Sequence, residues 1–346
     1  GLDEAVLTGT GRLRGHQVAV VVSEFAFLAG SIGVAAGERL VGAVERATRE
    51  RLPLVAAPAS GGTRLQEGTV AFLQMVKVAA AIADHRSAGL PYLVYLRHPT
   101  TGGVLASWGS LGHVTAVEPG ALIGFLGPRV YEALHGQPFP PGVQVAENLY
   151  AKGLVDAVVA PSGVAKVAAR ILEVLCAPRE LPQAAEPLAD DHVDGTPVAE
   201  SIRRSRRPDR PGVRTLLKAV AQDVTPLSGT GAGEMDPGVL LALARFGPAP
   251  CVVLGQDGHR QRRRQPLGPA GLRAARRGIR IARELDLPLV TVIDTAGAAL
   301  SKEAEEGGLA GEIARCLVDL VTLPAPTLCL LLGEGAGGGA LAFLPT

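Results

Sequence analysis

The chain has 346 residues, of which 47% are apolar and only 3% are aromatic, and it contains 44 glycines. This length exceeds the usual limit of a single hydrophobic core and predicts two domains. The formal net charge is +1, from 34 basic and 33 acidic residues, so no long-range field attracts nucleic acid or an anionic membrane. Any anionic ligand must therefore be held by a local site.

Cysteine usage and apolar run length bound the class of protein. The four cysteines lie far apart, and three sit in apolar runs, where cysteine is typically a small core residue. This spacing argues against a zinc site or a disulfide framework. The sequence has no signal peptide and no uninterrupted apolar run near the roughly 20 residues of a membrane span, so we expect a soluble cytoplasmic protein.

An internal repeat sets the expected architecture. Residues 46–62 resemble residues 280–297: each segment reads as the end of a charged helix, then Leu-Pro-Leu-Val opening a buried strand, then a small-residue turn with glycine. Residues 89–107 and 324–342 form a second pair, an apolar strand that runs into Gly-Gly and a helical start. The order strand, helix, strand, helix, strand, helix thus occurs twice, which predicts two α/β domains of one kind.

Helices are predicted in matching places of the two copies. One covers about 34 to 50, and its counterpart begins near Pro269, a favourable first helical residue. A later helix in each copy has apolar residues that recur at helical spacing along one face. These faces are Val70, Leu73, Val76 and Ala80 in the first copy, and Leu309, Ile313, Leu317 and Leu320 in the second.

The boundary between the two copies is predicted at residues 178–200, which have the Pro, Ala and acidic bias of a surface linker. This gives an N-terminal domain at 1–177 and a C-terminal domain at 201–346. The second copy stops just after its Gly-Gly strand, whereas the first continues well beyond its own. By internal analogy we expect the second domain to be C-terminally incomplete.

The Gly-Gly turns are candidate anion sites. Gly102 and Gly103 follow one apolar strand, and Gly338 and Gly339 follow the matching strand. Glycine leaves backbone N–H groups uncovered and a helix start adds partial positive charge, so such a turn can act as an oxyanion hole. The alternative is that these glycines only let a helix pack closely on a sheet. Their occurrence at matched positions of both copies favours the anion sites.

Two further glycine-rich turns, at 60–68 and 294–308, also follow buried strands. Neither is a Walker loop, because no Gly-Lys-Ser/Thr follows. The alternative interpretation is a plain turn with a helix cap, in which Arg64 and Glu67 form a local pair at the helix start.

At these residues the sequence resembles the carboxyltransferase subunits of biotin-dependent acyl-CoA carboxylases, chiefly the acetyl-CoA type. The first half is similar to the family's beta part in SGGTRLQEG at 60–68, TTGGVLASWGSLG at 100–112 and EPGALIGFLGPRV at 118–130. The second half is similar to the alpha part in RRPDRPGVRTLL at 206–217 and GEGAGGGALA at 333–342. The resemblance implies fused beta-like and alpha-like halves, built as two tandem crotonase-like (ClpP/crotonase) spiral domains.

The family's chemistry follows from the same resemblance. There, carboxybiotin on a carrier protein supplies the carboxyl group, the acyl-CoA α carbon accepts it, and biotin takes the proton, so no protein general base is required. Two backbone oxyanion holes are implied, with the catalytic residues Gly102, Gly103, Gly339 and Ala340. Substrate binding is implied for Gly61, Gly62, Arg64, Gly297 and Gly338.

The resemblance also implies partners and a pathway. The partners are a biotin carboxyl carrier protein, a biotin carboxylase, acyl-CoA and further copies of the chain in a dimer or larger ring, with the product used in fatty acid biosynthesis. No metal, nucleic acid or membrane is implied as a partner of this chain.

Several segments depart from the family pattern. The beta part's N-terminal four-cysteine zinc ribbon is absent, and GQDGHRQRRRQ at 255–265 replaces the alpha part's glycine-rich basic loop. Where Pro and Tyr usually follow the Asp-Thr, this chain has Ala296, Ala298, Ala299 and Leu300. The lining of that turn is therefore altered.

Some residues and functions keep two interpretations. Arg260, Arg262, Arg263 and Arg264 can meet CoA phosphates or form a solvated loop. His98 and His113 flank the first Gly-Gly turn, where core or capping roles are the more common. The rival functions are a biotin-dependent acyl-CoA decarboxylase subunit, a crotonase-type hydratase using Glu118, and a non-catalytic scaffold subunit of a carboxylase complex.

Overall fold

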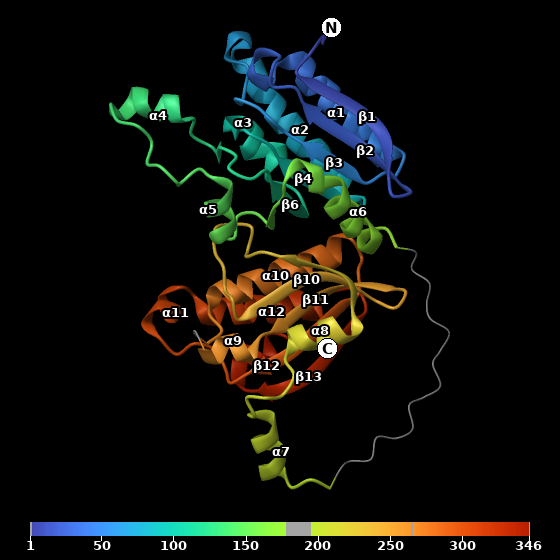
Figure 1. Cartoon of the computed structure of the whole chain (residues 1–346), viewed down its shortest axis with the longest axis vertical. Helices are drawn as coiled ribbons and strands as arrows, with labels where there is room; N and C mark the ends of the chain where they lie inside the picture. Colours follow the sequence, from blue (N-terminus) through green and yellow to red (C-terminus); the bar gives the residue numbers. More distant parts are fainter. Residues whose placement is uncertain (1, 178–194, 264–265, 346) are drawn as a thin grey trace. The chain divides into compact units, whose positions relative to one another are not determined.

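The protein is described by a computed structural model that covers residues 2–177, 195–263 and 266–345 (Figure 1). It forms two compact units. The first comprises Gly1–Leu172 with Gly231–Gly233, and the second comprises Glu173–Thr230 with Glu234–Thr346. Most of the expected linker, 178–194, lies outside the described residues, and the domain limits 1–177 and 201–346 stay predictions.

The first unit is built on a six-stranded sheet in the order β1-β2-β3-β4-β6-β8. Strands β1 and β2 form an antiparallel hairpin, and the remaining pairs are parallel. A short parallel pair, β5 with β7, lies beside the Gly-Gly turn. The strands are β1 (Val6–Leu13), β2 (His16–Ser23), β3 (Leu54–Ala57), β4 (Tyr92–Leu96), β5 (Thr100–Thr101), β6 (Val114–Val117), β7 (Ile123–Gly124) and β8 (Ala157–Val158).

Helices cover both faces of this sheet, and this is why β4 is buried along its whole length. The α-helices are α1 (Val34–Arg49), α2 (Thr69–Ser87), α3 (Gly102–Val104), α4 (Pro128–His135), α5 (Ala146–Ala151) and α6 (Val164–Leu175). Short helical turns lie at Leu28–Gly30, Leu65–Glu67, Leu105–Gly109 and Pro161–Gly163. The helix expected over 34 to 50 is confirmed as α1.

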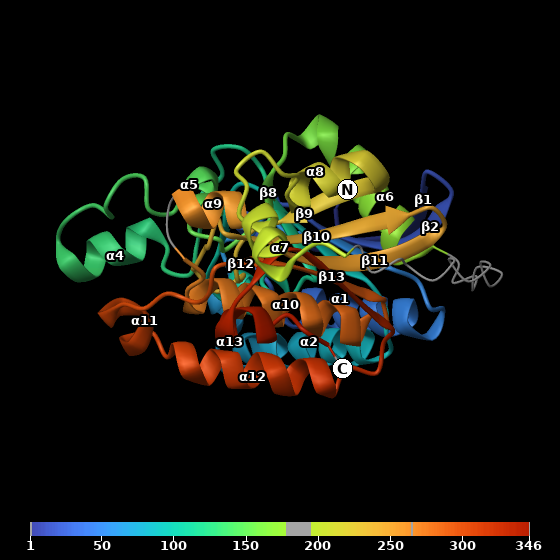
Figure 2. The same cartoon turned by 90° about the horizontal axis from the view of Figure 1, so that it is seen from below.

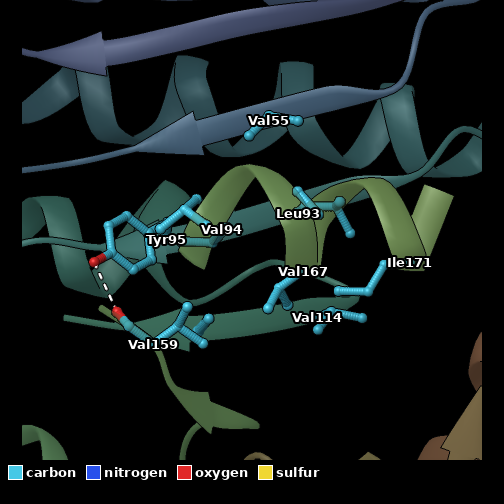
Figure 3. Close-up of a pocket in the computed structure, with 11 residues that line it drawn as sticks. Val55, Leu93, Val94, Tyr95, Val114, Val159, Val167 and Ile171 are labelled. Carbon is cyan, nitrogen blue, oxygen red and sulfur yellow. Dashed lines mark hydrogen bonds between the residues drawn. The ribbon is translucent and has the colours of Figure 1, made fainter. Parts of the chain in front are cut away.

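A small cavity lies where α6 packs on β3, β4 and β6 (Figure 3). Its volume is about 30 Å³, close to the share of one water molecule in liquid water. Val, Leu, Ile and Ala side chains line it, together with Tyr95, whose hydroxyl donates a hydrogen bond to the Val159 carbonyl at 2.9 Å. The cavity is a packing void and is far too small for an acyl-CoA ligand.

The second unit has a five-stranded sheet in the order β13-β12-β11-β10-β9. Strands β9, β10 and β11 are antiparallel to one another, whereas β11, β12 and β13 are parallel. The strands are β9 (Gln222–Leu227), β10 (Val239–Phe246), β11 (Ala249–Gln256), β12 (Leu289–Thr295) and β13 (Thr327–Gly335).

Helices α10 and α12 lie side by side on one face of this sheet, and α8 packs on the other (Figure 2). The helices are α7 (Val198–Ser205), α8 (Val213–Val220), α9 (Gly258–Arg263), α10 (Pro269–Glu284), α11 (Lys302–Glu306), α12 (Leu309–Val321) and α13 (Gly337–Leu341). The prediction that a helix begins at Pro269 is confirmed.

The internal repeat is present in the structure. Three pairs of matched elements begin at one constant offset in residue number. Their first residues pair as Leu54 of β3 with Leu289 of β12, Tyr92 of β4 with Thr327 of β13, and Val34 of α1 with Pro269 of α10. Each copy therefore contains a hairpin-like antiparallel pair followed by two parallel crossovers, each carried by a helix.

The predicted apolar faces of the later helices are only partly buried. In α2, the face with Val70, Leu73, Val76 and Ala80 is exposed, and Val76 is 67% accessible. The buried face is Ala71, Gln74, Val78, Ala81, Ile82 and His85. In α12, Leu309 and Leu320 are buried, while Leu317 is 37% accessible. The predicted helical spacing is thus confirmed, and the apolar face that these residues form on α2 is exposed.

Among the described helices, none is both long and apolar enough to cross a membrane.

Candidate functional site

The first glycine turn begins directly after β3, and a buried serine organises it. The Ser60 hydroxyl donates to the Gly30 carbonyl at 2.6 Å and accepts the Gly62 amide at 3.0 Å. Gly62 has φ +110°, a conformation that a side chain rarely permits. The Gly61 amide donates to the Ala29 carbonyl at 2.8 Å. The N–H groups of both glycines are thus used to hold the turn itself.

The second arm of this site is the segment that leads into α3. Gly102 has φ +60°, and its amide donates to the Phe125 carbonyl at 3.0 Å. A Cβ atom on Gly62 would lie 3.4 Å from the Gly102 Cα and 3.5 Å from the Gly103 nitrogen. The two backbones are therefore in contact, and the Gly103 amide belongs to the first turn of a helix, where no intrahelical acceptor exists.

Gly103 has no room for a side chain. A Cβ atom there would lie 2.1 Å from the Met75 sulfur and 2.8 Å from the Thr63 hydroxyl. The Met75 and Thr63 side chains would have to move to admit a side chain there. The alternative considered from the sequence, that these glycines let a helix pack closely, therefore also holds at this position.

Arg64 lies in the same turn, but its guanidinium points inward. It pairs with the Glu4 carboxylate and with Glu67 at 3.0 Å, and it donates to the Ser31 carbonyl at 2.8 Å. Its side chain is 7% accessible. The hydrogen bonds from Arg64 hold the pKa of Glu4 below its ordinary value. These contacts give Arg64 a role in fixing the turn, and substrate binding by its side chain stays a prediction.

The second unit repeats the first turn with a threonine in place of the serine. The Thr295 hydroxyl accepts the Gly297 amide at 3.2 Å and donates to the Gln261 side-chain oxygen at 2.7 Å. Gly297 has φ +128°, and it stands at the repeat offset from Gly62. The same hydroxyl-to-glycine turn thus ends β3 and β12.

The arm that leads into α13 approaches this turn as α3 approaches the first. Gly337 has φ +60°, like Gly102, and the two residues are again separated by the repeat offset. A Cβ atom on Gly339 would lie 2.9 Å from the Ala298 nitrogen, so only glycine fits. The amides of Gly338 and Gly339 fall in the first helical turn, whereas the Ala340 amide is directed to the Ala336 carbonyl at 3.4 Å.

The structure therefore brings the predicted site residues together as two groups, one in each unit. Gly61, Gly62, Arg64, Gly102 and Gly103 form the first, and Gly297, Gly338, Gly339 and Ala340 form the second. Sequence reasoning missed Ser60, Thr295 and Gly337. A Ser or Thr two residues before each turn glycine was a readable signal for the first two.

A buried ion pair holds the residue that precedes the second turn. Arg210 donates to the Asp294 carboxylate at 2.8 Å, and the Asp294 side chain is fully buried. A Cβ atom on Gly258 or Gly333 would lie 2.6 or 2.4 Å from that carboxylate. The RRPDRP segment thus contributes an arginine that anchors the residue immediately before Thr295.

Two arginines of α9 form ion pairs with carboxylates in the same unit. Arg260 lies 3.5 Å from Asp257, and Arg262 lies 3.4 Å from Glu334. Arg264 lies outside the described residues. These ion pairs leave the proposed contact with CoA phosphates untested.

The two histidines near the first site make backbone hydrogen bonds. The Nδ1 atom of His98 accepts the Leu122 amide at 3.0 Å, and that of His113 accepts the Tyr92 amide at 3.0 Å. Glu118 accepts the His98 amide at 2.8 Å. These contacts give all three residues roles in holding the loops after β4 and β6.

The four cysteines, Cys176, Cys251, Cys316 and Cys329, are free thiols. Burial raises the pKa of Cys251 to about 12, so this thiol stays protonated at neutral pH. Within residues 2–177, 195–263 and 266–345, no three His, Cys, Asp or Glu side chains gather as metal ligands would.

Comparison with known proteins gives a family and several relatives of this chain. The model of the carboxyl transferase domain matches residues 2–346. A probable biotin-dependent acyl-coenzyme A carboxylase beta3 subunit of Mycobacterium tuberculosis is 62% identical over all of this chain and 69% of its own length. The acetyl-coenzyme A carboxylase carboxyl transferase subunits beta/alpha of Salinispora arenicola are 38% identical over 99% of this chain and 63% of their own length.

Solved structures show the same fold at lower identity. Transcarboxylase 12S matches with a TM-score of 0.80 and 20% identity, covering 98% of this chain and 66% of that one. A single-chain, multi-domain long-chain acyl-CoA carboxylase matches with a TM-score of 0.78 and 20% identity, over 98% of this chain and 33% of that one. The chain therefore spans about a third to two thirds of the length of these structural neighbours.

Proposed function

We propose, from the premise that this chain belongs to the carboxyl transferase domain family, that it transfers a carboxyl group from carboxybiotin on a carrier protein to the α carbon of an acyl-CoA. The observation that carries the proposal is the duplicated glycine turn, with one copy in each unit. We also propose that each unit is a crotonase-like spiral domain, which the constant offset between matched strands supports.

For this reaction the protein mainly has to supply N–H donors that stabilise negative charge on two oxygens. Negative charge develops on the thioester oxygen when the α carbon loses its proton, and on the biotin ureido oxygen when the carboxyl group leaves. Biotin supplies both the carboxyl group and the acceptor for that proton. Two separate backbone sites can stabilise these two oxygens, and removing one such donor typically costs about 3 kcal/mol of barrier.

The hydrogen bonds already made by each backbone amide suggest which amides are free to act as oxyanion donors. In the first turn, Gly102 donates to Phe125, so we assign the donor role to Gly103 and a conformational role to Gly102. In the second, Gly338 and Gly339 lie in the first helical turn, and Ala340 makes only a long bond to Ala336. We assign the second oxyanion site to these three residues.

The proposed substrate is acetyl-CoA, or propionyl-CoA, and the product from acetyl-CoA is malonyl-CoA. The proposed partners are a biotin carboxyl carrier protein, a biotin carboxylase and other copies of this chain. The names of the mycobacterial and Salinispora relatives support this set. The exposed apolar face of α2 supports an oligomer, because apolar patches of this kind commonly mark contacts between proteins.

Reverse transfer tests the proposal. The full-length protein is incubated with malonyl-CoA and biocytin, and acetyl-CoA formation is followed, with methylmalonyl-CoA as the second substrate. The variant Gly339→Ala, whose Cβ would meet the Ala298 backbone, should lose at least about 100-fold in kcat. Gly42→Ala is the matched control, since nothing lies within 4 Å of a Cβ there.

The outcomes separate the rival functions. Transfer that is lost in Gly339→Ala and kept in Gly42→Ala supports the proposal. Release of carbon dioxide from malonyl-CoA in preference to carboxylation of biocytin points to the decarboxylase. A folded, assembled protein that binds acyl-CoA without turnover of either substrate refutes the proposal and favours the scaffold subunit, for which the altered turn with Ala296 and Ala298 is the motivating observation.

A further inference from the structure

Gln256 connects the two arms of the second glycine site. It is the last residue of β11, and its side chain is fully buried. Its Nε2 atom donates to the Gly339 carbonyl at 2.7 Å, and its Oε1 atom accepts the Asp294 amide at 3.1 Å. One side-chain amide thus joins the start of α13 to the end of β12.

The Gly339 carbonyl depends on a donor from outside its helix because α13 has only 5 residues. The Ala342 amide donates to the Gly338 carbonyl at 3.0 Å, and the next amide, that of Phe343, donates to the Ala340 carbonyl at 3.0 Å. Neither of these two amides donates to the Gly339 carbonyl. Gln256 supplies the donor that the helix does not, as short helices require of their surroundings.

This bond has a consequence for the neighbouring N–H group. The Gly339 carbonyl and the Ala340 amide belong to one planar peptide, so fixing the oxygen also fixes the direction of that N–H. The bond from the Ala340 amide to the Ala336 carbonyl is 3.4 Å long, beyond the usual range for such bonds. The helix alone therefore holds this peptide weakly, and the shorter Gln256 contact sets its plane.

The first unit has a related bond from a different residue, one position earlier in the helical turn. The Ser107 hydroxyl, which is buried, donates to the Gly103 carbonyl at 2.6 Å. Ser23, the last residue of β2 and the counterpart of Gln256 at the end of β11, has no hydrogen-bond partner for its hydroxyl within the described part of the chain. Each glycine turn thus has one buried side-chain donor on a carbonyl of its first helical turn.

We propose that Gln256 is a positioning residue of the second oxyanion site: it holds the Gly339–Ala340 peptide through the Gly339 carbonyl, so that the Ala340 amide, whose bond to Ala336 is long, is shared with the oxygen that becomes negatively charged. This inference rests on the proposed carboxyl transfer. The side chain makes no contact with substrate in this role, and it acts only through the peptide it holds.

The test uses two variants of similar size in the full-length protein. Gln256→Met removes both hydrogen bonds, and Gln256→Glu keeps the acceptor for Asp294 but sets a carboxylate against the Gly339 carbonyl. Misplacing a catalytic donor by about 1 Å can cost about 100-fold. We therefore expect kcat for reverse transfer to fall by up to about 100-fold in both variants, with KM for malonyl-CoA changed by less than about threefold.

Gln74→Met is the matched control, because Gln74 is a buried glutamine of the first unit and its Oε1 atom has no partner within the described residues. It should leave kcat unchanged. A wild-type kcat in folded Gln256→Met, or an equal loss in Gln74→Met, overturns the proposal.

A second measurement does not depend on turnover. Hydrogen exchange of the peptide that covers 333–344 should become faster in Gln256→Met, while exchange of the peptide covering 98–106 stays unchanged. Unchanged exchange at 333–344 refutes the positioning role. If the wild-type protein transfers no carboxyl group, the proposed function fails, and this measurement still decides whether Gln256 holds the Gly339–Ala340 peptide.

Discussion

Arg64 and Glu4 form a buried ion pair that joins the first glycine turn to the segment just before β1. Both Nη atoms of Arg64 donate to the Glu4 carboxylate, one of them at 3.1 Å, and the side chains are 7% and 6% accessible. A buried charge left without its partner is costly, whereas an intact pair is close to neutral. Removing one partner should therefore destabilise the fold more than the intact pair of Arg64 and Glu4 stabilises it.

Glu4→Gln should lower the free energy of unfolding by about 2 kcal/mol, because it leaves the buried Arg64 guanidinium with only the partly exposed Glu67 as a counter-charge. Urea denaturation at pH 7 measures the change. Asp3→Asn is the control, since Asp3 pairs with Arg39 at the surface, where its side chain is 73% accessible. That variant should lose less than about 1 kcal/mol. Equal losses in the two variants would contradict the prediction.

The sequence predicted the repeat and both groups of site residues, but not the register of the glycines. Gly102 and Gly103 were paired with Gly338 and Gly339, because the second copy has three consecutive glycines and letters alone cannot align them. Backbone conformation decides the register: Gly102 and Gly337 share φ +60°. The first helical turn of the second arm therefore begins one residue earlier than expected.

The exposure of the apolar face of α2 has a packing cause. Periodicity selects the most apolar face, yet the buried face contains Ala71, Gln74 and His85. Helices α1 and α2 pack closely there, and a Cβ atom on Gly37 of α1 would lie 2.6 Å from the Gln74 side-chain oxygen. Small and polar residues fit this close contact, so the larger apolar residues remain on the outer face. The most apolar face of a helix therefore does not identify the buried face where a second helix packs as closely as α1 packs on α2.

Buried His85 should make the first unit sensitive to acid. Burial lowers the pKa of His85 to about 4, and its ring contacts the Thr48 hydroxyl at 3.0 Å and the Pro91 carbonyl at 3.3 Å. Because the folded pKa lies below the ordinary value of 6.5, the unfolded chain binds the proton first as the pH falls. Stability is therefore lost between about pH 6.5 and pH 4, by at most about 3 kcal/mol.

His85→Gln should flatten this part of the pH profile, since glutamine does not titrate and can still donate to the Pro91 carbonyl. Urea denaturation at several pH values between 7.5 and about 4.5 measures the slope. His135→Gln, at the exposed end of α4, should keep the wild-type slope. An unchanged slope in His85→Gln would show that other groups control the acid response.

Glu312 holds α12 to α10 in the second unit. Its side chain is 5% accessible and lies 2.9 Å from Arg315, 3.1 Å from Arg273 and 3.3 Å from Arg276. Burial raises the pKa of Glu312, but the hydrogen bonds from these arginines outweigh burial and hold it below its ordinary value. The stabilisation is therefore present at neutral pH and lost as the carboxyl group is protonated in acid.

Glu312→Gln should lower the free energy of unfolding by about 2 kcal/mol at pH 7, less than a fully buried pair because the arginines are partly solvated. The difference from the wild type should shrink as the pH falls below about 4. Glu306→Gln removes an exposed partner of Lys302 at 3.7 Å and should cost less than about 0.5 kcal/mol. A larger loss in Glu306→Gln than in Glu312→Gln would refute the assignment.

The Thr295 hydroxyl should contribute more to stability and to kcat than the Thr295 methyl group does. It is fully buried, accepts the Gly297 amide at 3.2 Å and donates to Gln261 at 2.7 Å. Thr295→Val therefore removes, at almost constant volume, the partner of the buried Gln261 oxygen and of the partly buried Gly297 amide. We expect a loss of about 2 kcal/mol in stability and a fall in kcat for reverse transfer. Thr295→Ser keeps the hydroxyl and should retain most of both. Ser60 already performs this task in the first unit, where its hydroxyl accepts the Gly62 amide at 3.0 Å. If Thr295→Ser were as damaging as Thr295→Val, the methyl group and its packing, rather than the hydroxyl-to-glycine turn, would be what shapes the second site.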